Sequence, residues 1–158
     1  MTLCVKSDQI QLVRFFVENG ADMNAKDGHG FTPLNTAINY GNTEIARMLL
    51  EKGVDMTKNS LNGWPPLNFA LWSVWKGYGH IDIVKLLLEF GADINGFDGN
   101  GNAPLHFAVS NDQLDIIQIL MCHGASISYR NQEGFTPLEL ALDEEEMDSW
   151  KLILYESL

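Results

Sequence analysis

Histidine and cysteine are the side chains in this 158-residue sequence with the widest range of catalytic and metal-binding chemistry. The four histidines are scattered along the chain, at His29, His80, His106 and His123. The two cysteines, Cys4 and Cys122, form no Cys-x-x-Cys pair and share no metal-ligand spacing with a histidine. No nucleophile stands beside a base and an orienting third group. We therefore expect no catalytic residue and no metal site.

A glycine- and asparagine-rich segment, DGNGNA from Asp98, faintly resembles the start of a calcium-binding loop. Ala103 replaces the glycine required at the sixth position, and Val109 replaces the chelating glutamate at the twelfth. The glycine pair of this segment recurs at Gly28 and Gly30, which indicates a repeated turn and not a phosphate-binding loop. We expect no cofactor.

Composition and charge narrow the class of protein. Hydrophobic residues make up 46% of the chain and charged residues 20%, which is typical of a folded protein. The formal net charge of -11 opposes binding to nucleic acid or to an anionic membrane, because both require cationic side chains. The N-terminal sequence lacks the pattern of a classical signal peptide, and no apolar stretch is long enough for a membrane helix. Two cysteines far apart favour a reducing, cytoplasmic location, although export without a cleaved N-terminal signal is compatible with the sequence.

Two motifs repeat with one shared, irregular period. The first motif occurs as GFTPLNTAI at Gly30, GWPPLNFAL at Gly63, GNAPLHFAV at Gly101 and GFTPLELAL at Gly134. The second occurs as NGADMN at Asn19, KGVDMT at Lys52, FGADIN at Phe90 and HGASIS at His123. Successive copies of both are 33, 38 and 33 residues apart. Two different motifs that share the same spacings are typical of a repeat protein.

Each repeat can be interpreted as a helix, a turn, a second helix and a loop. Thr32 is a suitable N-cap, and Pro33 suits the first helical position. Apolar residues follow helical spacing over 34–38 and again over 45–50, and Gly53 suits the residue that ends the second helix. Neither helix can bury its apolar stripe alone, so the repeats must stack.

At these residues the sequence resembles the ankyrin repeat family, through TPLNTA, PPLNFA, APLHFA and TPLELA and through the Gly-Ala-Asp turns. The resemblance implies an all-α fold: an L-shaped ankyrin-repeat solenoid of stacked helix-turn-helix units with β-turn or hairpin loops. We expect a single domain over residues 1–158. It divides into a partial repeat (1–26), a repeat (27–59), a repeat with a five-residue insertion (60–97), a repeat (98–130) and a C-terminal capping repeat (131–158).

The sequence departs from the family pattern at several positions. Asn35, Asn68 and Glu139 stand where the family usually has histidine, and His106 alone matches. The first repeat lacks the half that carries the Thr-Pro-Leu motif. Either another repeat once preceded Met1, or MTLCV is a degenerate cap.

The resemblance also implies a concave surface, built from loop tips and inner helix faces, that usually binds another protein. Phe31, Trp64 and Phe135 occupy equivalent positions there, and aromatic residues are enriched at interface hot spots. The rings either contact a partner or pack against neighbouring loops. The candidate partner-binding residues are Phe31, Tyr40, Leu61, Trp64, Trp72, Trp75, Tyr78, Phe97, Asn100, Arg130 and Phe135.

The five-residue insertion lies between the two helices of the repeat at 60–97. Apolar residues keep helical spacing through the insertion point, which predicts a first helix about one turn longer than usual. It should end near Lys76, with Gly77 as the C′ residue. Trp72 and Trp75 would then lie on one flank of this helix. Trp75 and Tyr78 either cap the extended helix or enlarge the aromatic surface, and we favour the second interpretation.

The sequence thus predicts a non-enzymatic protein–protein interaction module, acting as an adaptor, inhibitor or regulatory subunit on an unidentified protein. We expect a monomer. One alternative is a structural segment of a longer ankyrin array, or a scaffold that self-associates through its N-terminal edge, where apolar surface should be exposed around Leu12, Val13 and Phe16. Another is a pathogen effector that uses the same binding mode.

Overall fold

The computed structural model describes residues 1–7, 9–57, 63–77 and 81–143. Over these residues the chain is helical, with nine helices and no strand, which confirms the all-α prediction. The chain divides into two compact units, residues 1–92 and residues 93–158. The repeat boundaries given above remain a prediction.

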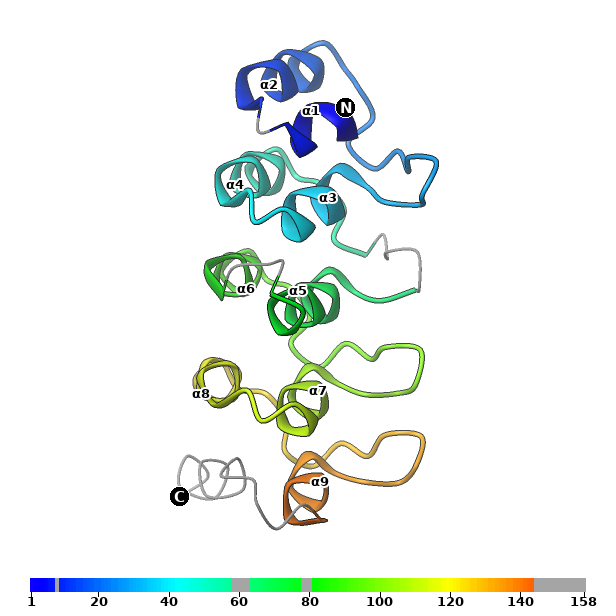
Figure 1. Cartoon of the computed structure of the whole chain (residues 1–158), viewed down its shortest axis with the longest axis vertical. Helices are drawn as coiled ribbons and strands as arrows, with labels where there is room; N and C mark the ends of the chain where they lie inside the picture. Colours follow the sequence, from blue (N-terminus) through cyan, green and yellow to red (C-terminus); the bar gives the residue numbers. More distant parts are fainter. Residues whose placement is uncertain (8, 58–62, 78–80, 144–158) are drawn as a thin grey trace. The chain divides into compact units, whose positions relative to one another are not determined.

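The first unit contains six helices that pack as three pairs. They are α1 (Thr2–Lys6), α2 (Ile10–Glu18), α3 (Pro33–Asn39), α4 (Thr43–Glu51), α5 (Pro66–Trp75) and α6 (Ile81–Glu89). Each odd-numbered helix packs against the even-numbered helix that follows it, and α3 also contacts both α1 and α5. The even-numbered helices form a second row, with α4 between α2 and α6 (Figure 1). This arrangement is the stacking that the repeats require.

The second unit continues the same pattern over its described residues. Its helices are α7 (Pro104–Ser110), α8 (Leu114–Cys122) and α9 (Pro137–Asp143). Helix α7 packs against both α8 and α9, and a loop extends to one side before α9 (Figure 1). Helices α3, α5, α7 and α9 each begin at the proline of the repeated motif.

Helix α5 has the extended length that the insertion predicts. It contains 10 residues, whereas α3 and α7 contain 7 each. It ends at Trp75 with Lys76 as the C-cap, and Gly77 follows with a φ of 77°, a left-handed conformation that suits glycine. The predicted end of the helix is therefore confirmed. At the turn after α7, Asp112 takes the left-handed role with a φ of 48°.

The cores consist of apolar side chains from the facing sides of the helices. The largest fully buried ones are Leu34, Ile38, Ile45, Leu49, Leu67, Leu71, Ile83, Leu86, Leu87, Leu105, Ile116 and Ile117. They lie at the helical spacings read from the sequence. Burial of such a side chain stabilises the fold by about 1.5–3 kcal/mol, so packing between repeats dominates over the propensity of these short helices.

The loops that precede the first helices share one hydrogen-bonded turn. The backbone N–H of Asp27 donates to the carbonyl of Phe31 (2.9 Å), and the carboxylate of Asp27 accepts from the N–H groups of His29 and Phe31. Asp98 and Asn131 make the corresponding bonds in their loops. In these three loops the Asp or Asn thus fixes the position of the residue directly before the N-cap of α3, α7 or α9.

The first residues of the chain form a short helix. Residues 2–6 form α1, which packs against α2 and α3, in the segment that one of the two alternatives described as a degenerate cap. Leu12 and Phe16 are exposed, as predicted, at 40% and 36%. The prediction for Val13 was wrong, because this side chain lies on the side of α2 that packs against other helices and is fully buried.

Candidate functional site

Four aromatic rings lie in continuous contact in residues 1–92. Phe31 packs on Phe69 with ring centroids 5.7 Å apart. Phe69 stacks on Trp72, also at 5.7 Å and with an interplanar angle of 22°. Trp72 then meets Trp64 edge to face at 6.2 Å. We call these four residues the aromatic run; it joins three of the predicted partner-binding residues through Phe69.

Helix α5 and two loops position the aromatic run. Phe69 and Trp72 are three residues apart on α5 and therefore share a face of that helix. Phe69 is 5% exposed and anchors the run in the core, whereas Phe31, Trp64 and Trp72 are partly exposed. The buried ring thus holds partly exposed rings at the surface, in a fixed arrangement.

The start of α3 is fixed beside the aromatic run by a reciprocal capping box. The hydroxyl oxygen of Thr32 accepts from the backbone N–H of Asn35 (3.1 Å), and Asn35 Oδ1 accepts from the backbone N–H of Thr32 (3.2 Å). Because Thr32 directly follows Phe31, the capping box also restrains the backbone that carries that ring. Among the described residues, Nδ2 of Asn35 is buried with no hydrogen-bond partner.

The other candidate residues of the first unit lie at the helix ends. Tyr40 follows α3 and is 49% exposed. Trp75, the last residue of α5, is 46% exposed, and the ammonium of Lys76 lies 4.1 Å from its ring centroid in a cation–π contact. Leu61 and Tyr78 fall outside the described residues, so the question of whether Tyr78 caps the helix or enlarges the surface stays a prediction.

The second unit carries a separate aromatic pair. Phe97 meets Tyr129 edge to face at 5.5 Å, and these side chains are 48% and 43% exposed. The loops that carry them are tied by Asn95, whose Oδ1 accepts from the backbone N–H of Ser126 (3.0 Å). Phe97 was predicted as a site residue, but Tyr129 was not.

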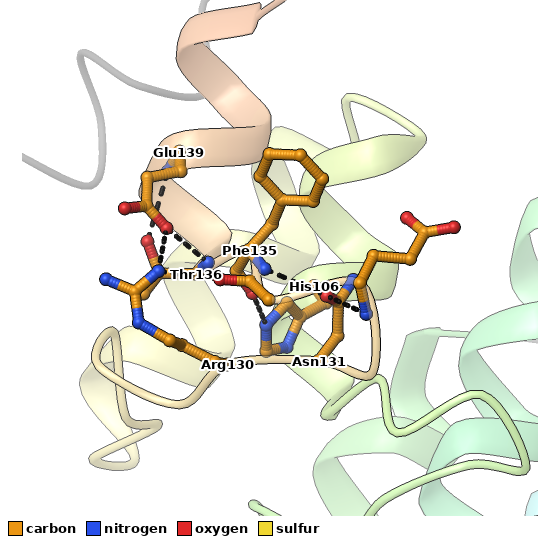
Figure 2. A network of polar contacts seen from close by, with 8 residues as sticks. His106, Arg130, Asn131, Phe135, Thr136 and Glu139 are labelled. Carbon is orange, nitrogen blue, oxygen red and sulfur yellow. Dashed lines mark hydrogen bonds and ion pairs between the residues drawn. The ribbon is translucent and has the colours of Figure 1, made fainter.

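Arg130 belongs to a polar network at the start of α9 (Figure 2). One guanidinium nitrogen donates to the carbonyl of Gly134 (2.6 Å) and to the carboxylate of Glu139 (2.7 Å). The same carboxylate accepts from the backbone N–H of Thr136, and this donor, followed by Arg130, lowers the pKa of Glu139. Arg130 thus links the loop carbonyl of Gly134 to the Glu139 carboxylate in the first turn of α9.

The remaining candidates of the second unit flank this network. Phe135 is 43% exposed, and its carbonyl accepts a hydrogen bond from the buried His106 ring (Figure 2). Asn100 is exposed, and its carbonyl accepts from the backbone N–H of Gln132 (3.4 Å). The side chain of Phe135 is thus exposed, while its backbone carbonyl is fixed by the hydrogen bond from His106.

Two residues of these aromatic groups escaped sequence reasoning. Phe69 reads as part of the core stripe of its helix, and its contacts with the rings on either side depend on three-dimensional packing. Tyr129 follows the serine-rich SIS segment, where no repeat position marked it. The signal that could have found Phe69 is its spacing of three from Trp72.

Within the part of the chain that the structure describes, no three His, Cys, Asp or Glu side chains are placed to hold a metal ion. Among the described helices, none has the length and apolar character needed to cross a bilayer.

Comparison with known proteins identifies the class to which this fold belongs. The family model for ankyrin repeats (3 copies) matches residues 1–98, 76–131 and 97–157. The chain therefore belongs to the ankyrin repeat family, as the sequence motifs predicted. A similar segment occurs in the mouse (Mus musculus) SMC5-SMC6 complex localization factor protein 1, with 45% identity over 42 residues. That match covers 27% of this chain and 4% of the mouse protein.

Proposed function

We propose that this chain is a non-enzymatic protein-binding module that grips one protein partner through the aromatic run. The observation that carries the proposal is the ring-to-ring contact from Phe31 through Phe69 and Trp72 to Trp64. Ankyrin repeats are a scaffold for protein–protein interaction, and the function of such a scaffold resides in the side chains on its surface.

The arrangement of the rings supports binding in addition to packing. Trp64 and Trp72 are partly exposed although tryptophan has the largest side chain of the standard residues. Their contacts with each other and with Phe69 fix their orientation before any partner arrives, so little side-chain entropy is lost on binding. Preorganised tryptophans of this kind are typical of interface hot spots.

The partner is expected to be a protein. The net charge of -11 opposes phosphate backbones and anionic lipid surfaces, as noted above. The mouse relative is named as a localization factor of a protein complex, which fits an adaptor role for the segment that the two chains share. The free cysteines Cys4 and Cys122 favour a reducing, intracellular compartment.

The proposal can be tested by identifying a partner and then measuring its affinity for matched variants. Proteins captured by the chain from cell extract would be identified by mass spectrometry, and the strongest purified candidate would be titrated calorimetrically. Trp72→Ala should weaken binding at least about 30-fold, the effect of losing a hot spot worth about 2 kcal/mol.

Phe15→Ala is the matched control, because Phe15 is 57% exposed on α2, away from the aromatic run. It should leave the affinity within about twofold of that of the unchanged chain. Circular dichroism must show that both variants stay folded. A folded Trp64→Ala, Trp72→Ala double variant that binds the partner with full affinity would refute the proposal.

A further inference from the structure

The outward side of α2 exposes three large apolar side chains. Leu12, Phe15 and Phe16 are 40%, 57% and 36% exposed, and they stand at positions i, i+3 and i+4 of one helix. The rings of Phe15 and Phe16 meet edge to face at 6.0 Å. We call these three residues the α2 face. It is separate from the aromatic run.

The equivalent positions of the next two repeats are buried. Ile45, Met48 and Leu49 of α4 correspond to the α2 face through the 33-residue period and are at most 5% exposed. Their counterparts in α6, Ile83, Leu86 and Leu87, are at most 1% exposed. Helix α4 has α2 beside it and α6 has α4 beside it. The α2 face is thus a surface built to pack against another helix, and no described helix of the chain covers it.

The surface beside the α2 face is hollowed. Gln9, Ile10, Gln11 and Leu12 line an open hollow of about 450 Å³ at the start of α2. The described residues that line it are uncharged. A side chain of a docking helix can therefore enter it without removing an ion from water.

The charge of the chain is distributed unevenly. Residues 1–18 contain two cations, Lys6 and Arg14, and two anions, Asp8 and Glu18, so their formal charge is zero. Residues 93–158 contain two Lys/Arg and twelve Asp/Glu, so their formal charge is -10. Because residues 1–18 carry no net charge, two copies that meet through this segment do not bring like net charges together at the contact.

From these observations we infer that a second copy of this chain docks on the α2 face, with α2 packed against α2 in a symmetric pair. A two-fold arrangement brings the same apolar patch of both copies together and buries all six side chains. Arg14 and Glu18 are exposed on the same helix and have opposite charges, so a symmetric pair keeps the rim of the contact neutral.

Sedimentation velocity of the full chain tests the inference over protein concentrations from about 5 μM to about 1 mM, a range in which micromolar to millimolar dissociation constants are detected. The sedimentation coefficient should rise with concentration from monomer towards dimer. Phe15→Glu should stay monomeric throughout, because it places a charge in the apolar contact. Phe97→Glu is the matched control: it makes the same change at a side chain that is 48% exposed in the other unit, and it should associate as the unchanged chain does.

The dependence of self-association on salt concentration provides a second test. Because acidic segments repel and the contact is apolar, raising the ionic strength from about 0.02 M to about 0.2 M should tighten the association. A chain that remains monomeric at about 1 mM in both salts overturns the inference. So does a dimer that Phe15→Glu and Leu12→Glu leave intact while both variants remain folded by circular dichroism, since the contact would then lie elsewhere.

The result of the self-association experiment does not depend on whether the aromatic run binds a partner. Trp72→Ala should not alter self-association, and Phe15→Glu should not alter the affinity for a protein that binds the aromatic run. A monomeric chain that still loses its partner on Trp72→Ala would refute the pairing alone.

Discussion

The imidazole of His106 joins two successive repeats: its Nε2 donates to the carbonyl oxygen of Phe135, 3.0 Å away. Its Nδ1 lies 3.2 Å from the backbone nitrogen of Ala103 and accepts that N–H. A ring that accepts at Nδ1 must carry its proton on Nε2, so the folded state requires the neutral tautomer. One buried side chain thus caps α7, in a position where Ala103 offers no capping oxygen, and holds the loop that leads to α9.

This geometry predicts that acid weakens the fold. Burial lowers the pKa of His106 below its ordinary value of 6.5, although the carbonyls of Phe135 and Tyr129 and the charge of Asp98 offset part of the effect. The folded state therefore binds fewer protons than the unfolded state just below pH 6.5. The stabilisation is fully present above that pH and is lost as the pH falls towards the folded-state pKa. Urea unfolding midpoints measured from about pH 7.5 to about pH 5.5 should decrease.

His106→Gln should reduce the dependence on pH over this range, because it removes the titrating group. His123→Gln is the control, since His123 is exposed; it should preserve the dependence. An equal pH dependence in the unchanged chain and in His106→Gln would show that His106 does not cause it.

Residues 1–92 have two counterparts of His106, Asn35 and Asn68. The Nδ2 of Asn35 is buried without a partner among the described residues. Asn35 and Trp64 are 29 residues apart, as are His106 and Phe135. The longer histidine side chain in place of Asn35 should reach the carbonyl of Trp64. Asn35→His should therefore raise the free energy of unfolding by about 1 kcal/mol, measured by urea denaturation.

Asn35→Ala serves as the comparison for that variant. It removes the two hydrogen bonds that Asn35 Oδ1 accepts from the backbone N–H and the hydroxyl of Thr32, and it should lower the free energy of unfolding by about 1–2 kcal/mol. If Asn35→His is destabilised as much as Asn35→Ala, the histidine has not made the bond.

Alanine substitutions at two glycines can separate two contributions to the loss of stability: strain in a left-handed backbone and steric crowding of the added Cβ. Gly101 and Gly124 both have positive φ, at 73° and 83°. A Cβ at Gly101 would lie 2.8 Å from Cγ of Gln132 and 3.1 Å from its backbone nitrogen, whereas a Cβ at Gly124 meets nothing within 4 Å. Gly124→Ala should cost about 1 kcal/mol of stability through left-handed strain alone. Gly101→Ala should cost more, because the backbone of Gln132 must also move.

Thermal unfolding of the two alanine variants, compared with the unchanged chain, measures this difference. Equal losses for Gly101→Ala and Gly124→Ala would mean that the two loops are not in close contact.

The ion pair between Arg130 and Glu139 allows a prediction about the pKa of Glu139. The N–H of Thr136, and after it Arg130, hold the pKa of Glu139 below its usual range. Arg130→Gln should raise this pKa part of the way back in an NMR titration, since the Thr136 donor remains. A lowered folded-state pKa stabilises the fold above the unfolded-state value, and this contribution disappears as the pH falls through the folded-state value. A pKa unchanged in Arg130→Gln would remove Arg130 from the network.

The parts of the fold that could be predicted are those set by the repeat period and by residues that act on their own backbone. The family, the helical class and the end of α5 followed from the repeat period, the motif prolines and Gly77, because these residues act on their own backbone. The capping boxes that Thr32 forms with Asn35, and Thr136 with Glu139, were also readable as Thr-x-x-Asn and Thr-x-x-Glu, but they were interpreted only as departures from the family histidine.

The candidate site was predictable only in part. Phe31 and Trp64 were predicted because they stand just before the Pro-Leu motif, and Trp72 because it stands at an inner-helix position. Phe69 was missed, since an apolar residue in a core stripe gives no sign that one edge of its ring reaches a surface cluster. The error at Val13 has the same origin: helical spacing does not state which side of a lone apolar helix has a neighbour until the partner helices are placed.

The edge-to-face contact between Trp64 and Trp72 has an optical consequence. Two indole chromophores held 6.2 Å apart at 73° couple their electronic transitions, which produces a pair of circular dichroism bands of opposite sign beside the helical signal. A bound protein that separates or rotates either ring would change these bands. The chain thus carries a label-free reporter of occupancy at its own candidate site.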